Sequence, residues 1–143
     1  MSLDEIYQDL ILDHSKHPRC KGALTDADRS VELYNPLCGD KIELFVKLAD
    51  DKVSEVAFTG HGCSISQATA SLMAEHIKGK SIEEARDLAK IYRQMMRGEA
   101  SEEELVKLGD VRALEGVRKF SARIKCALLA CDCVDKVLAP TKQ

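Results

Sequence analysis

The stretch IELFVKLADDKVSEVAF, residues 42–58, decides the fold of this 143-residue chain. Aliphatic side chains occupy every second position of its first half, at Ile42, Leu44, Val46 and Leu48. A period of two is typical of a strand with one buried face. The residues 50–52 signal a turn, and residues 53–58 form a further extended run. Because Val31 and Leu33 alternate in the same way upstream, the sequence predicts three short strands in an antiparallel meander.

Helical patterns precede and follow these strands in the sequence. Ser2 and Glu5 form a capping-box pattern at the start of a helix that should end before Pro18. After Gly62 we expect helices over 64–78, from 81 to about 97, from 101 onward and from 121 or 123 to 138, with a mixed segment over 110–120. The sequence therefore predicts one α+β domain, residues 1–143, with a small three-stranded antiparallel sheet packed against about five to six helices.

Charge and hydropathy exclude several classes of protein. The chain has 21 Lys and Arg against 24 Asp and Glu, a net charge of −3, so no basic stripe indicates a nucleic-acid surface. No apolar run approaches the ~20 residues of a membrane span. The acidic N-terminus lacks the pattern of a secretory signal. We therefore expect a cytoplasmic protein that binds neither nucleic acid nor membrane.

The six cysteines are the most informative feature of the composition, because thiols in a reducing compartment more often bind metals or react than form disulfides. Cys38 lies in the expected loop between the first two strands, Cys63 where the third strand gives way to a helix, and Cys126 near the start of the last helix. A helix N-terminus stabilises a thiolate. Asp40 lies two residues after Cys38, and three thiolates with one carboxylate make a tetrahedral set suited to an exchangeable Zn²⁺.

The spacing alone leaves other interpretations open. The three cysteines are dispersed rather than grouped in the close C-x₂-C pairs of a zinc ribbon. His61, two residues before Cys63, is an alternative ligand, although a loop position near the site is the simpler interpretation. The remaining cysteines are expected to be packing or surface residues: Cys20, Cys131 and Cys133.

Several motifs together resemble one known family. They are Asn35-Pro36-x-Cys38-Gly39-Asp40, Gly60-x-Gly62-Cys63-x-Ile65-Ser66 and Arg123-Ile124-Lys125-Cys126. In this order they resemble the U-type iron–sulfur cluster assembly proteins, the IscU/SufU-like family. The long stretch between Cys63 and Cys126 is more similar to the SufU branch, and so is Lys125, where IscU proteins carry a histidine. The chaperone-recognition motif of IscU is also missing, since residues 119–123 read KFSAR.

The resemblance implies the SufE/IscU-like fold and a zinc ion held by Cys38, Asp40, Cys63 and Cys126. It also implies work with a SufS-like cysteine desulfurase, which uses pyridoxal phosphate, and with a downstream iron–sulfur assembly complex. Cys38 matches the sulfur acceptor, and Arg123 is a candidate for holding Asp40 when ligands rearrange. Cys131 departs from the family pattern, which often has Trp there, and raises the idea of an extra reactive thiol beside the site.

Three functional hypotheses follow. The first is a zinc-dependent sulfurtransferase in which Cys38 accepts persulfide sulfur from the desulfurase. The second is a scaffold on which an iron–sulfur cluster is built, with Cys38, Cys63 and Cys126 as cluster ligands. The third is a structural zinc domain, which would unfold on chelation.

Overall fold

The sheet has the antiparallel order β1-β2-β3 that the alternating patterns predict. The computed structural model describes residues 3–36 and 39–140, and the strands are β1 Arg29–Asn35, β2 Asp40–Ala49 and β3 Lys52–His61. Every second side chain of β2 is buried from Asp40 to Val46, as expected of a strand with one covered face. The register pairs Asn35 with Asp40 and Lys41 with His61, so the end of β1, the start of β2 and the end of β3 lie at one edge of the sheet.

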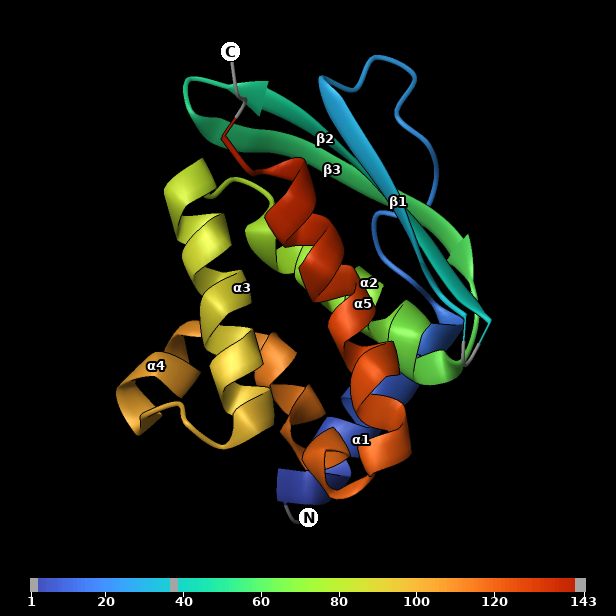
Figure 1. Ribbon diagram of the computed structural model, residues 1–143, viewed down its shortest axis with the longest axis vertical. Helices are drawn as coiled ribbons and strands as arrows, with labels where there is room; N and C mark the ends of the chain where they lie inside the picture. The colour runs from blue at the N-terminus through green and yellow to red at the C-terminus, as the bar shows by residue number, and fades with distance from the viewer. Residues whose placement is uncertain (1–2, 37–38, 141–143) are drawn as a thin grey trace.

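Helices cover one face of the sheet (Figure 1). They are α1 Leu3–Lys16, α2 Ser64–Ile77, α3 Ile82–Arg97, α4 Glu102–Lys107, the 3₁₀ helix η1 Gly109–Lys119 and α5 Ser121–Val137. The capping boxes Ser81/Glu84 and Ser101/Glu104 are both formed, and Gly98 ends α3 with φ 76°. The predicted α+β architecture, with a three-stranded antiparallel sheet and six helices, is confirmed.

Residues 110–119 of the segment expected to be mixed belong to the 3₁₀ helix η1, and Phe120 is its C-cap. Its buried residues include Val111, Leu114 and Val117, which are spaced by three. A 3₁₀ helix has three residues per turn, so this spacing puts all three side chains on one face against the core.

Helix α5 lies centrally, against β1 and β2 on one side and against α2 and α3 on the other (Figure 1). The Tyr92 hydroxyl of α3 donates to the Ala127 carbonyl of α5 at 2.7 Å, and both residues are fully buried. Arg93 of α3 donates to Asp132 and Asp135 of α5, each at 2.7 Å. These contacts fix the position of α5 along its axis and its rotation about that axis. They thereby fix the position of Cys126, which lies one residue before Ala127. Among the described helices, none is both long and apolar enough to span a bilayer.

Candidate metal centre

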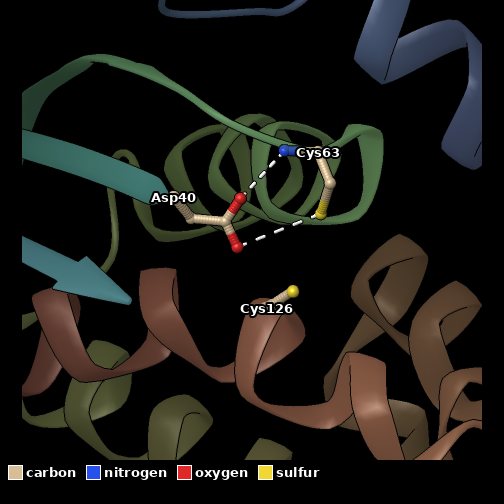
Figure 2. A group of neighbouring side chains, drawn as sticks. All are labelled: Asp40, Cys63 and Cys126. Carbon is tan, nitrogen blue, oxygen red and sulfur yellow. Dashed lines mark hydrogen bonds between the residues drawn. The ribbon is translucent and has the colours of Figure 1, made fainter. Parts of the chain in front are cut away.

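Three of the four side chains that the sequence singled out meet at one edge of the sheet (Figure 2). A carboxylate oxygen of Asp40 and the sulfurs of Cys63 and Cys126 all lie within 4.8 Å of one another. Ligand atoms bound to one zinc ion lie about 3.3 to 3.8 Å apart, given Zn–O and Zn–S bonds of ~2.0 to 2.3 Å. A small contraction of the side chains would therefore bring all three atoms to one ion.

Asp40 is the first residue of β2, and its side chain is almost fully buried, with 1% of its surface exposed. Its Oδ1 accepts a hydrogen bond from the backbone N–H of Cys63 at 2.9 Å, and its Oδ2 lies 4.0 Å from the Cys63 sulfur. The approach requires glycine at position 62, since a Cβ there would lie 2.2 Å from Oδ1 and φ is +144°. The chain thus presents the carboxylate to the same space as the thiol.

Cys63 is the N-cap residue of α2. Its sulfur accepts the backbone N–H of Ser66 at 3.4 Å, and its carbonyl accepts the Ser66 hydroxyl at 3.0 Å. A sulfur in this position receives one of the free N–H groups of the first helical turn and the positive end of the helix dipole. The thiolate is the form of cysteine that binds metals.

Cys126 approaches from α5 and is fully buried. Its sulfur accepts a hydrogen bond from the side-chain amide of Asn35, with Nδ2 at 3.9 Å. The exposed Arg123 lies one turn earlier, and its pKa is raised, chiefly by the negative charge of Cys63 and then by a hydrogen bond with Cys126. The centre therefore combines two sulfurs, one carboxylate and one neighbouring cation.

The fourth expected ligand, Cys38, lies outside the described residues. His61 is the last residue of β3, is exposed, and does not belong to the group formed by Asp40, Cys63 and Cys126. The sequence placed it in a loop, whereas it continues the β2–β3 ladder opposite Lys41.

The three remaining cysteines of the described residues, Cys20, Cys131 and Cys133, do not belong to this group. Cys131 is fully buried against α3, with its thiol 3.2 Å from the Ala89 carbonyl, and burial raises its pKa to about 12. Burial also raises the pKa of Cys133 to about 12, and its thiol lies 3.8 Å from the Ile42 carbonyl. Cys20 is half-buried, and its pKa is raised by burial. The idea that Cys131 is a reactive thiol beside the site is therefore wrong, because its side chain is enclosed between two helices.

Sequence reasoning did not single out Asn35 as a site residue. It is quoted in the motif before Cys38, but its contact with Cys126 joins residues 91 positions apart. Its residue type and position could have indicated a role at the site. Asn35 is the one asparagine of the chain, and it lies near an expected ligand at the predicted end of a strand.

The fold that carries this group matches known proteins. The family model described as the NifU-like N terminal domain matches residues 6–127. The chain belongs to this family. Its resemblance to the U-type assembly proteins is thereby confirmed.

Relatives within the NifU-like family carry two kinds of name. The chain is 48% identical over 138 residues to the zinc-dependent sulfurtransferase SufU of Bacillus subtilis (strain 168), covering 96% of this chain and 92% of that protein. It is 44% identical over 128 residues to the iron–sulfur cluster assembly scaffold protein IscU of Streptococcus pyogenes serotype M1, covering 90% and 79%.

Solved structures agree with the NifU-like fold. A putative iron–sulfur cluster assembly scaffold protein for the SUF system from Fervidobacterium islandicum AW-1 superposes with a TM-score of 0.87 at 34% identity, over 96% of this chain and 99% of that one. The N-terminal part of a nitrogen-fixing NifU-like protein from Brucella abortus superposes with a TM-score of 0.82 at 27% identity, over 95% and 94%.

Proposed function

We propose that this protein is a zinc-dependent sulfur acceptor in iron–sulfur cluster assembly, with Cys38, Asp40, Cys63 and Cys126 as the metal ligands. The observation that carries the proposal is the convergence of Asp40, Cys63 and Cys126 from three separate elements. Two thiolates and a carboxylate suit Zn²⁺, and a third thiolate would complete a tetrahedral set. The 48% identity to a protein named as a zinc-dependent sulfurtransferase supports the same assignment.

Bound zinc would keep its cysteine ligands deprotonated at neutral pH. The chain's own residues divide the remaining tasks. Cys63 and Cys126 are held by helices α2 and α5 and are suited to remain ligands. Cys38 comes from the connection between β1 and β2, so we assign it the role of the ligand that is released when a cysteine desulfurase docks. Arg123, exposed beside the two sulfurs, is positioned to support Asp40 when the ligands rearrange.

The transfer step is a thiolate exchange. The Cys38 thiolate attacks the terminal sulfur of the persulfide on the desulfurase and forms a new S–S bond, while the S–S bond of that enzyme breaks. The enzyme cysteine leaves as a thiolate, and Cys38 carries the sulfane sulfur as its own persulfide. The step needs no external oxidant or reductant, because the sulfane sulfur changes partners without a net change in electrons.

The matched variants Cys38→Ser and Cys20→Ser test this proposal, with a pyridoxal-phosphate cysteine desulfurase and cysteine as substrate. We expect Cys38→Ser to abolish both the stimulation of the desulfurase and the persulfide adduct seen by mass spectrometry. We expect Cys20→Ser to retain both, since Cys20 lies outside the centre. Full stimulation by Cys38→Ser would contradict the role assigned to Cys38.

The scaffold function is the second candidate, and the identity to proteins named as IscU scaffolds favours it. Cysteine ligands also suit iron–sulfur clusters. Anaerobic reconstitution in the presence of equimolar zinc separates the two functions. An iron–sulfur cluster that forms although zinc is present, and that passes intact to an apo-ferredoxin, supports the scaffold function. Displacement of iron by zinc from the site supports the sulfur acceptor.

A further inference from the structure

The buried side-chain amide of Asn35 lies beside the metal centre. Asn35 is the last residue of β1, pairs with Asp40 in the sheet, and has 6% of its surface exposed. Its Nδ2 donates across the gap between sheet and helix to the sulfur of Cys126, which is fully buried. Water therefore cannot take over this hydrogen bond from the amide.

An N–H···S hydrogen bond has a definite effect on a thiolate. A donor that points at an anion stabilises it and withdraws part of its charge. Hydrogen bonds from outside the ligand shell orient metal ligands and tune the charge that they give to the metal. The sulfur of Cys63 has a different donor, the backbone N–H of Ser66. Arg123 neighbours both sulfurs, whereas the Ser66 N–H serves Cys63 and the Asn35 amide serves Cys126. Of the last two donors, only the amide belongs to a side chain that mutation can remove.

The side chain of Asn35 acts separately from its backbone. The Asn35 carbonyl accepts the Gly39 N–H at 2.9 Å, which closes the connection between β1 and β2. Any residue at position 35 can make this backbone bond. A substitution that removes only the amide therefore leaves the closing bond of the connection in place and removes the donor to Cys126.

We propose that Asn35 is a positioning residue that keeps Cys126 a permanent, weakly nucleophilic thiolate ligand. This inference rests on the proposed metal centre. By withdrawing charge from the Cys126 sulfur, the amide lowers the tendency of that sulfur to attack a persulfide while the metal is bound. It thereby directs sulfur acceptance away from the buried helix cysteine and toward the ligand supplied by the β1–β2 connection.

Cobalt(II) is the probe for this inference, because a thiolate bound to Co²⁺ gives a charge-transfer absorption whose energy reports the charge on the sulfur. The variants are Asn35→Leu, which has a similar shape, and Asn35→Ala, which covers the case in which leucine disturbs folding. Gln67→Leu is the matched control. Gln67 is also a buried amide near the centre, but its Nε2 donates to the Ser66 hydroxyl rather than to a sulfur.

We expect both Asn35 variants to bind Co²⁺ and Zn²⁺ about 10- to 100-fold more weakly than the unmodified protein. We also expect their charge-transfer band to move to longer wavelength, because a sulfur without its donor gives up charge more easily. Circular dichroism establishes that each variant is folded. Gln67→Leu should retain both the affinity and the band position of the unmodified protein.

Three results would overturn the inference. An unchanged band and affinity in the folded Asn35 variants would show that the amide does not tune the sulfur. If Gln67→Leu changes the metal affinity and the band position equally, the effect comes from the general loss of a buried polar group and not from the hydrogen bond to Cys126. If the unmodified protein gives no thiolate-to-cobalt band at all, the proposed metal centre fails and the role of Asn35 fails with it. The spectrum of the unmodified protein therefore tells a failure of the metal centre apart from a failure of the role of Asn35 alone.

Discussion

Gly62 is the residue at which the fold and the centre depend most directly on each other. A Cβ at this position would lie 2.2 Å from Oδ1 and 2.9 Å from Cα of Asp40, and the backbone has φ +144°. In Gly62→Ala the non-glycine conformation costs about 1 to 3 kcal/mol. Displacement of the carboxylate would also remove its bond with the Cys63 N–H, and a hydrogen bond to a charged group is worth about 1.5 to 3 kcal/mol.

Together these effects predict a loss of about 2.5 to 6 kcal/mol in the free energy of unfolding. For a chain of this length the melting temperature should fall by roughly 10 to 20 °C. Metal affinity should fall as well, because the displaced carboxylate no longer faces Cys63. Chemical denaturation followed by circular dichroism measures the first effect, and chelator competition measures the second.

Gly116→Ala is the matched control. A Cβ at Gly116 meets no atom within 4 Å, and no left-handed φ is required there. This substitution should be neutral or stabilising by about 0.4 to 1 kcal/mol. If Gly62→Ala and Gly116→Ala have the same stability and the same metal affinity, the account of the close approach between Gly62 and Asp40 is wrong.

Three further predictions concern the core and the centre. His14 is buried with its Nδ1 2.7 Å from the Ser71 hydroxyl, and its pKa is lowered, first by burial and then by Arg19. The His14 side chain therefore binds a proton more readily in the unfolded chain, so the free energy of unfolding should fall as the pH drops below about 6.5. In urea unfolding between pH 7.5 and 5.5, His14→Gln should flatten this pH dependence. An equally steep fall in the variant would refute the role of His14. Tyr92→Phe removes the 2.7 Å bond to the Ala127 carbonyl and should cost about 1 kcal/mol in urea unfolding, with an unchanged midpoint as the contrary result. Chelation of bound metal should leave the far-ultraviolet circular dichroism intact, because the hydrophobic core extends well beyond the edge that carries the centre; collapse on chelation would instead favour a structural zinc domain.

Local signals predicted the regular elements well. The alternation of β2 and the capping boxes at Ser81 and Ser101 act over a few residues, so the sequence displays them directly. The 3₁₀ helix was harder to predict, because apolar residues three apart also fit an α-helix. His14 lies in the last turn of α1 but is buried against Ser71, 57 residues away. A partner so distant in sequence cannot be read from local spacing.

The same limit applies to the centre. The chemistry of Asp40, Cys63 and Cys126 was visible in the residue types and their motifs, but their convergence depends on strand register and on the packing of α5. Cys131 and Cys126 belong to one helix, and only the position of α3 decides that Cys131 is enclosed. Asn35 reaches Cys126 because β1 lies against α5, a contact that no pattern within either element encodes.

The order in which the three converging side chains occur along the chain matters during synthesis. Asp40 and Cys63 leave the ribosome before Cys126, which belongs to α5. Until α5 has been made, a nascent chain therefore presents only two of these three side chains. The group of three is therefore complete only after α5 has been synthesised and has packed against β1 and β2.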